Sequence, residues 1–169
     1  MPMTLPRAFS VLCRQAGFTL VELVVVMVLL GILAVVVLPR LASTNAFGDA
    51  AFHAEVVAGL RYAQKSAVSH RRLVCAELTA TTLTLRIAAS NPAAACGAAL
   101  LRAPDGAEVF ASTTRASMAL AAGNLPLTLH FQPDGRISSD VAGTAVWTGT
   151  VVIDDMPGIS IAGATGYVK

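Results

Sequence analysis

The N-terminal part of the chain contains the stretch QAGFTLVELVVVMVLLGILAVVVLP, which runs from Gln15 to Pro39. Glu22 is its one charged side chain, and a run of 21 mostly apolar residues extends from Phe18 to Leu38. At ~1.5 Å per residue, a helix over this run is about 31 Å long, which matches the hydrocarbon core of a bilayer. The stretch therefore predicts one transmembrane helix that carries a carboxylate near its start.

The residues before this run predict how the chain is oriented and processed. Arg7 and Arg14 are the charged side chains upstream of Phe18, and both are basic. Short basic segments stay on the cytoplasmic side of a membrane, so the remainder of the chain is expected to cross. The small residues Ala16 and Gly17 precede the apolar run, whereas a secretory signal has its small-residue cleavage site after it. Cleavage after Gly17 would leave the apolar helix on the mature chain.

The hexapeptide from Gly17 to Glu22, GFTLVE, resembles the cleavage and methylation site of type IV prepilins and of type II secretion pseudopilins. The resemblance implies that a prepilin peptidase removes residues 1–17 and N-methylates Phe18. It also implies that Glu22 meets the amino terminus of an adjacent subunit and so sets the axial register of a filament. The helix dipole also favours a carboxylate near the helix start.

Gly31 lies inside the apolar run, and Pro39 ends it. Proline lacks a backbone donor and clashes with the carbonyl four residues earlier, so a helix kink or a local loosening is expected there. The resemblance implies that the stretch between these two residues can melt during assembly. The alternative is that Pro39 only marks the end of the lipid-embedded part. Residues 18–39 are thus the expected transmembrane and filament-core helix.

Residues 40–70 follow as a second helical segment. Apolar residues recur there at three- or four-residue spacing, which predicts one buried stripe. Its members are Phe52, Val56, Leu60, Ala63 and Ala67. Arg61, Lys65 and His53 are expected to face away from the stripe, and the helix is expected to end at position 69 or 70. The resemblance makes this segment the amphipathic half of one long, bent helix.

Residues 71–169 change to short alternating runs between turn signals, which predicts β structure. The expected strands are Leu73–Leu78, Thr82–Ala88, Ala107–Phe110, Ser117–Leu120, Leu127–Phe131, Ala145–Ile153 and Ile159–Ala162. Ala89–Ala99 is expected to be an irregular loop. The whole chain therefore predicts an α+β, pilin-like fold, in which a long N-terminal helix packs on an antiparallel β-sheet head.

The three cysteines divide into Cys13 before the apolar run and Cys75 and Cys96 after it. If the head is exported to an oxidising space, Cys75 and Cys96 are expected to pair. Their disulfide would close a loop of about 21 residues and would stabilise the fold by roughly 3 kcal/mol in the chain-entropy model. The alternative is a pair of buried free thiols in a cytosolic domain.

Composition and spacing argue against several classes of function. The net charge is only +2, so no global attraction to nucleic acid or acidic lipid follows from it. His53, His70 and His130 show no spacing typical of a metal site, and no phosphate-binding glycine loop is present. Asp154 and Asp155 are adjacent, so they would point to opposite faces of a strand. We therefore expect neither an enzyme nor a bound metal or cofactor.

A local basic patch keeps DNA binding open as an alternative. Lys65, Arg71 and Arg72 could meet phosphates, because a nearly neutral protein can still bind DNA through a local basic stripe. A related minor pilin binds DNA through a C-terminal basic motif. Here Lys169 is the one basic residue after Arg136, so that motif is essentially missing.

Three segments of the expected head resemble particular subgroups of the pilin superfamily. The segments 60–67 and 131–135 are similar to the subgroup that contains the H-type pseudopilin, and the segment 164–168 looks most like minor pilins of the mannose-sensitive haemagglutinin pilus. The resemblance implies a minor type IV pilin that initiates or caps a filament. An H-type pseudopilin of a type II secretion system is the alternative.

The resemblance also implies where the chain acts and what it meets. It would sit first in the bacterial inner membrane, with one membrane pass and its head in the periplasm, and later in a pilus or pseudopilus filament. Its expected partners are other pilins or pseudopilins, the prepilin peptidase and the inner-membrane assembly platform.

Overall fold

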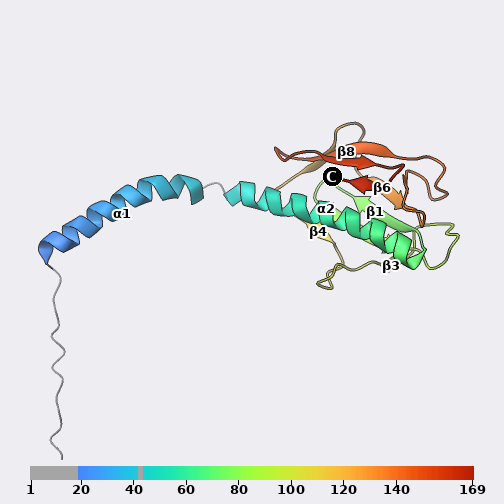
Figure 1. Cartoon of the computed structure of the whole chain (residues 1–169), viewed down its shortest axis with the longest axis horizontal. Coiled ribbons are helices and arrows are strands. Elements are labelled where there is room, and N and C mark those ends of the chain that lie inside the picture. The colour runs from blue at the N-terminus through green and yellow to red at the C-terminus, as the bar shows by residue number, and fades with distance from the viewer. Residues whose placement is uncertain (1–18, 42–43) are drawn as a thin grey trace, which may run out of the picture. The chain divides into compact units, whose positions relative to one another are not determined.

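A computed structural model describes residues 19–41 and 44–169, and the chain divides into two compact units, Met1–Ala42 and Ser43–Lys169. The described part of the first unit is one helix, α1 (Leu20–Leu41). The second unit holds a helix, α2 (Thr44–His70), and all the strands (Figure 1). The strands are antiparallel throughout, so the α+β class predicted from the sequence is confirmed.

Helix α1 contains both residues at which a kink is expected. Its backbone is helical through Gly31 and Pro39 and ends at Leu41, two residues after the proline. A Cβ atom added at Gly31 would meet no atom within 4 Å. No packing within the described residues therefore requires a glycine at this position, and the kink stays a prediction.

Helix α2 buries the stripe that its spacing predicts. Phe52 is 2 % exposed, and the other four members of the stripe are fully buried. The helix ends at His70 in a Schellman motif, because Arg72 N–H donates to the Ala67 carbonyl at 3.1 Å and Arg71 N–H donates to the Val68 carbonyl at 3.3 Å. These two bonds satisfy carbonyls that would otherwise lack an intrahelical partner.

Two sheets form the head. The larger one has the order β3-β2-β1-β6-β7, and a further strand, β4, also pairs with β2. Its strands are β1 (Val74–Leu78), β2 (Thr82–Ile87), β3 (Ala99–Leu100), β4 (Ala111–Ser112), β6 (Leu127–Phe131) and β7 (Ile137–Ser138). The smaller sheet has the order β10-β9-β8-β5, and its strands are β5 (Met118–Leu120), β8 (Thr148–Ile153), β9 (Ile159–Ala162) and β10 (Tyr167–Val168).

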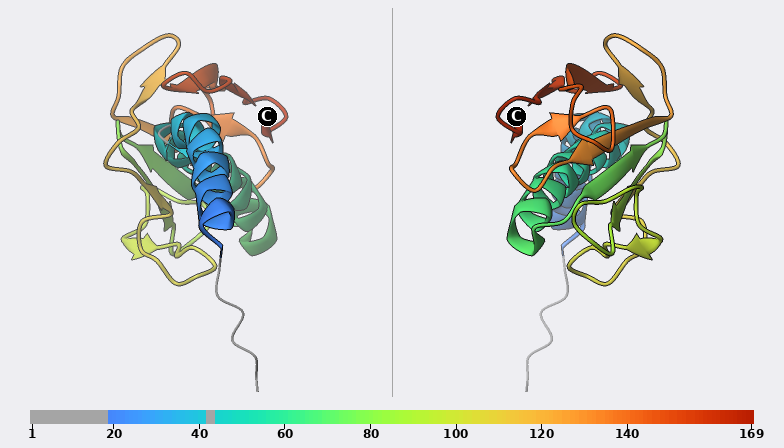
Figure 2. Two further views of the ribbon diagram at one scale, coloured as in Figure 1. Left: turned by 90° about the vertical axis from the view of Figure 1, so that its left-hand side faces the viewer. Right: turned by 90° about the vertical axis from the view of Figure 1, so that its right-hand side faces the viewer.

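One core joins α2 to both sheets, which flank the helix (Figure 2). The alternation along β1 decides which side chains reach this core: Val74, Ala76 and Leu78 belong to it, whereas Cys75 and Glu77 lie on the opposite face of the strand. From the smaller sheet, the core receives residues such as Met118, Val151, Ile153, Ile159, Ile161 and Val168.

The structure corrects one expected strand and adds three. The strand expected at Ala107–Phe110 is wrong, because β4 begins only at Ala111. Asp105 Oδ1 accepts the Ala107 N–H at 2.9 Å, and this local side-chain bond competes with a sheet ladder. The unexpected strands β3, β7 and β10 have two residues each, which is too short for an alternating pattern.

The expected strand Ala145–Ile153 starts later, at Thr148. The Asp140 carboxylate accepts the backbone N–H groups of Thr144 and Ala145 at 3.0 and 2.8 Å, and it also accepts the Thr144 hydroxyl at 2.8 Å. These bonds fold the residues before β8 into a turn instead of an extended strand.

Candidate assembly site

Helix α1 begins with a side-chain cap. The Thr19 hydroxyl oxygen accepts the backbone N–H of Glu22 at 3.2 Å, and the Thr19 carbonyl accepts the N–H of Leu23 at 3.1 Å. Thr19 is therefore the N-cap residue, and Glu22 is the third residue of the helix. Threonine followed three residues later by glutamate is the sequence signature of a capping box, so this signal was available from the sequence but was missed.

Glu22 is exposed in the first turn of α1. The positive end of the helix dipole favours a carboxylate in this turn. Two ion pairs are found in the described residues, Arg102 with Glu108 and Arg136 with Asp134, and neither involves Glu22. Within that part of the chain, the Glu22 carboxylate forms no ion pair.

From Leu20 to Leu33, the large apolar side chains of α1 are exposed. The large apolar side chains between Leu20 and Leu33 have exposed fractions from 45 % at Val26 to 78 % at Leu20. They occupy nearly every consecutive position, so the helix is apolar on all sides. Such a helix is buried by its surroundings in the functional state, and a large exposed apolar surface marks an interaction site. In the described part of the chain, no helix has both the length and the apolar character needed to cross a membrane.

Gly17 and Phe18, the expected cleavage and methylation residues, lie outside the described residues, as does the leader to which Gly17 belongs. The other expected site residues of this region lie on α1. Glu22 and Gly31 are part of the helix, and the backbone at Pro39 is helical.

The cations considered for DNA binding gather around the C-terminal end of α2. Lys65, Arg71 and Arg72 are all exposed. Arg71 has a φ of +51°, which is the left-handed conformation that a Schellman motif requires at this position. Arg61, one turn before Lys65, has a different role: its Nε and Nη2 donate to the Val168 carbonyl at 3.1 and 3.0 Å.

Cys75 on β1 and Cys96 in the loop between β2 and β3 form a disulfide, with a Cα–Cα distance of 5.8 Å. This is the pairing expected for an exported head. Gly97 lies so close to the backbone of Ile87 and Ala88 that a Cβ atom would clash with both. The disulfide and this close approach hold the loop against the face of the sheet that is turned away from α2.

His130 on β6 lies beside the disulfide. The residue is only 7 % exposed. Burial lowers the pKa of His130, against smaller opposing effects from a backbone hydrogen bond with Ser138 and from the charge of Asp140. The sequence indicated no role for His130, because Cys75, its partner on the neighbouring strand, lies far away along the chain.

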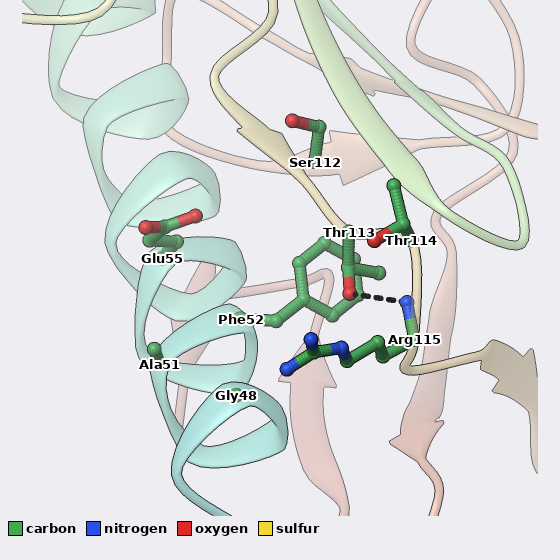
Figure 3. A pocket seen from close by; sticks show the side chains of 8 residues that line it. All are labelled: Gly48, Ala51, Phe52, Glu55, Ser112, Thr113, Thr114 and Arg115. Atoms are coloured by element: carbon green, nitrogen blue, oxygen red, sulfur yellow. Dashed lines mark hydrogen bonds between the residues drawn. The ribbon is translucent and has the colours of Figure 1, made fainter. Parts of the chain in front are cut away.

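A shallow pocket of about 340 Å³ lies between the first turns of α2 and the residues that follow β4 (Figure 3). Glu55 lines it from α2 and Arg115 from the opposite side, and the Thr113 hydroxyl accepts the Arg115 N–H at 3.2 Å. Phe52 forms part of its wall.

The similarity found to known proteins covers the N-terminal segment, including most of α1. The family model of the prokaryotic N-terminal methylation motif matches residues 12–38. Comparison with curated proteins and with solved structures gives no match. The matched residues include the expected cleavage site, the capping box and most of α1. The chain therefore carries the N-terminal motif of pilins and pseudopilins, a structural family, and this motif suggests processing by a prepilin peptidase and assembly with other pilins.

Proposed function

We propose that this protein is a minor type IV pilin, a non-enzymatic structural subunit that initiates or caps assembly of a pilus filament. The observation that carries the proposal is α1 itself, within the matched methylation motif. It exposes large apolar side chains from Leu20 to Leu33, and its capped first turn holds a carboxylate that forms no ion pair within the described residues. A helix of this kind is suited to being surrounded by the helices of other subunits.

In this proposal the chain passes through two environments. Prepilin peptidase removes residues 1–17 and methylates Phe18, while residues 18–39 hold the subunit in the bacterial inner membrane with the head in the periplasm. The assembly platform then moves the helix into the filament core. The disulfide between Cys75 and Cys96 supports a periplasmic head, because disulfides persist in oxidising compartments.

Glu22 would set the position of the subunit along the filament. The new amino group at Phe18 of an adjacent subunit carries the positive charge that the Glu22 carboxylate lacks within its own described chain. Removing one partner of a buried ion pair costs about 3–5 kcal/mol, because the other charge is left uncompensated. Only the register that brings these two groups together avoids that cost.

An H-type pseudopilin of a type II secretion system would use the same α1 and the same Glu22. The two functions differ in the filament that contains the subunit, so co-purification separates them. Recovery with sheared surface pili supports the minor pilin, and recovery only with a periplasmic secretion complex supports the pseudopilin.

A DNA-binding minor pilin is the second alternative, and the observation in its favour is the exposure of Lys65, Arg71 and Arg72 at one end of α2. Salt-sensitive binding of duplex DNA that is lost in the Arg71→Ala/Arg72→Ala variant supports this alternative. The absence of binding at low salt contradicts it.

The experiment that tests the main proposal compares Glu22→Ala with Glu55→Ala in cells that assemble filaments. Glu55 is an exposed glutamate on α2, so its removal controls for the loss of one helical carboxylate. We expect Glu22→Ala to be cleaved normally but to incorporate at least ~10-fold less than wild type, and Glu55→Ala to incorporate normally. Equal incorporation of both variants, measured by quantitative mass spectrometry of sheared filaments, would contradict the role of Glu22.

A further inference from the structure

The face of the larger sheet that is turned away from α2 brings three metal-binding side chains together. Cys75 on β1 and His130 on β6 are directly opposite each other in the antiparallel register. Cys96 reaches the same place from the loop after β2. Both strand residues are buried, with exposed fractions of 2 % for Cys75 and 7 % for His130.

The donor atoms of these side chains are close together. One ring nitrogen of His130 and the two sulfur atoms all lie within 4.8 Å of one another. The His130 Nδ1 atom is buried and has no hydrogen-bond partner among the described residues. A buried nitrogen without a partner is costly, and a bond to this atom would remove that cost.

We propose that Cys75, Cys96 and His130 bind one Zn²⁺ ion when the two cysteines are in the dithiol state. Thiolate sulfur and imidazole nitrogen are the ligands that zinc prefers, at about 2.3 Å for sulfur and about 2.0–2.1 Å for nitrogen. Small movements of side chains already within 4.8 Å of one another satisfy these distances.

The surroundings of the site leave room for a fourth ligand. A pocket of about 410 Å³ opens beside both cysteines, and its lining includes Glu77, Arg86 and Thr128. With three protein ligands, the tetrahedral zinc ion would take a water molecule from this pocket as its fourth ligand. The inference is independent of the filament role, because all three ligands belong to the head.

The metal and the disulfide exclude each other. On binding, each thiol loses its proton to solvent and each sulfur donates a lone pair to the ion, together with a lone pair from the imidazole. In the disulfide, the two sulfurs are bonded to each other and no thiolate exists. Newly made chains are in the dithiol state, and zinc would then hold the loop of Cys96 against β1. Exchange with the disulfide of an oxidised thiol–disulfide oxidoreductase would take the two electrons, join the two sulfurs and release the Zn²⁺ ion, so that the covalent bond replaces the metal.

The test uses the full chain in detergent, purified with a tag that contains no histidine and with Cys13→Ser to remove the third thiol. A water-soluble trialkylphosphine reduces the disulfide: phosphorus gives up two electrons, the S–S bond breaks, and water supplies the oxygen that ends on phosphorus and the two protons that end on sulfur. Zn²⁺ is then titrated against a chromophoric chelator, and Co²⁺ serves as the spectroscopic probe.

We expect the reduced chain to bind one equivalent of Zn²⁺, and Co²⁺ to give a thiolate charge-transfer band and tetrahedral visible absorption. The oxidised chain is expected to bind neither ion. His130→Gln should weaken Zn²⁺ binding at least ~10-fold, whereas the control His70→Gln, which changes an exposed histidine at the end of α2, should leave it unchanged.

Three results would overturn the proposal: no stoichiometric Zn²⁺ binding by the reduced chain, equal binding by the oxidised chain, or no effect of His130→Gln. If His130→Gln does not fold, X-ray absorption at the zinc edge of the reduced wild-type chain decides the matter. Two sulfur ligands with at least one imidazole ligand confirm the site, and a shell without imidazole contradicts it.

Discussion

Arg61 on α2 holds the last strand of the head through the carbonyl of Val168, to which its Nε and Nη2 donate at 3.1 and 3.0 Å. The two residues are 107 positions apart, so this contact fastens the smaller sheet to the helix that packs on the larger one. A side chain that the helical pattern assigns to solvent therefore has a structural role.

Replacing Arg61 by methionine should weaken the head. The variant keeps an unbranched apolar side chain but loses both donors, and we expect the free energy of unfolding to fall by about 1 kcal/mol. Lys65→Met is the matched control, because Lys65 is exposed one turn later on the same helix. Urea unfolding of the full chain in detergent measures the free energy of unfolding of both variants. An equal decrease in Arg61→Met and Lys65→Met would argue against a stabilising role of the bonds to Val168.

Arg71→Gly should stabilise the head. Arg71 has a φ of +51°, a conformation that costs a residue with a Cβ atom about 1–2 kcal/mol and costs glycine almost nothing. After the greater freedom of glycine in the unfolded chain is subtracted, we expect a gain of about 0.5–1 kcal/mol. Arg72→Gly removes the same charge at the next position, where no positive φ is found, and it should destabilise. Denaturant unfolding measures the free energy of unfolding of both variants. A change of the same sign in Arg71→Gly and Arg72→Gly would contradict this explanation.

Thr19→Ala should loosen the start of α1. The substitution removes the oxygen that accepts the Glu22 N–H, at a cost of about 1 kcal/mol of helix stability, whereas Thr19→Ser keeps that oxygen. Hydrogen exchange in detergent should be faster in the first turn of α1 for the alanine variant and close to wild type for serine. If the two variants exchange alike, the cap is not important for the helix start.

The Asp140 turn predicts a loss of stability in acid. Hydrogen bonds from the Ala145 backbone and from Thr144 lower the pKa of Asp140 from 3.8 to about 2. Because the folded-state pKa is the lower one, this contribution to stability is present above pH 3.8 and is lost as the pH falls through about 2.

Asp140→Asn should therefore reduce the dependence of stability on pH between 3.8 and about 2, measured by denaturant unfolding at several pH values. Part of the dependence should remain, because a backbone hydrogen bond from Arg136 also lowers the pKa of Asp134. Asp155→Asn is the control, since Asp155 is exposed in a different turn. If the stability of Asp140→Asn depended on pH as strongly as that of the wild type, the Asp140 carboxyl group would not contribute as described.

Local patterns predicted much of the fold. The stripe of α2 and the longer strands β1, β2, β6 and β9 have enough residues to show a period, and they lie where expected or within one residue of it. The strands β3, β7 and β10 have only two residues each, so they exist because of their neighbours and leave no pattern in the sequence.

The candidate sites show the same division between local and long-range signals. The cap of Thr19 on Glu22 involves four consecutive residues and is readable from the sequence. The proximity of His130 to Cys75 depends on the pairing of β1 with β6, and many residues separate these strands. A register between distant strands is set by tertiary packing, so the sequence alone could not place this imidazole beside the sulfurs.

The central place of β1 in the larger sheet also sets an order of events during folding. Its partner β2 follows at once, and Cys96 is 21 residues from Cys75, whereas β6 arrives only after a much longer segment has been made. Short loops close faster than long ones, so the two thiols can meet before the imidazole joins them. We therefore expect that a chain that meets an oxidant early forms the bond between Cys75 and Cys96 before His130 can complete the proposed zinc site.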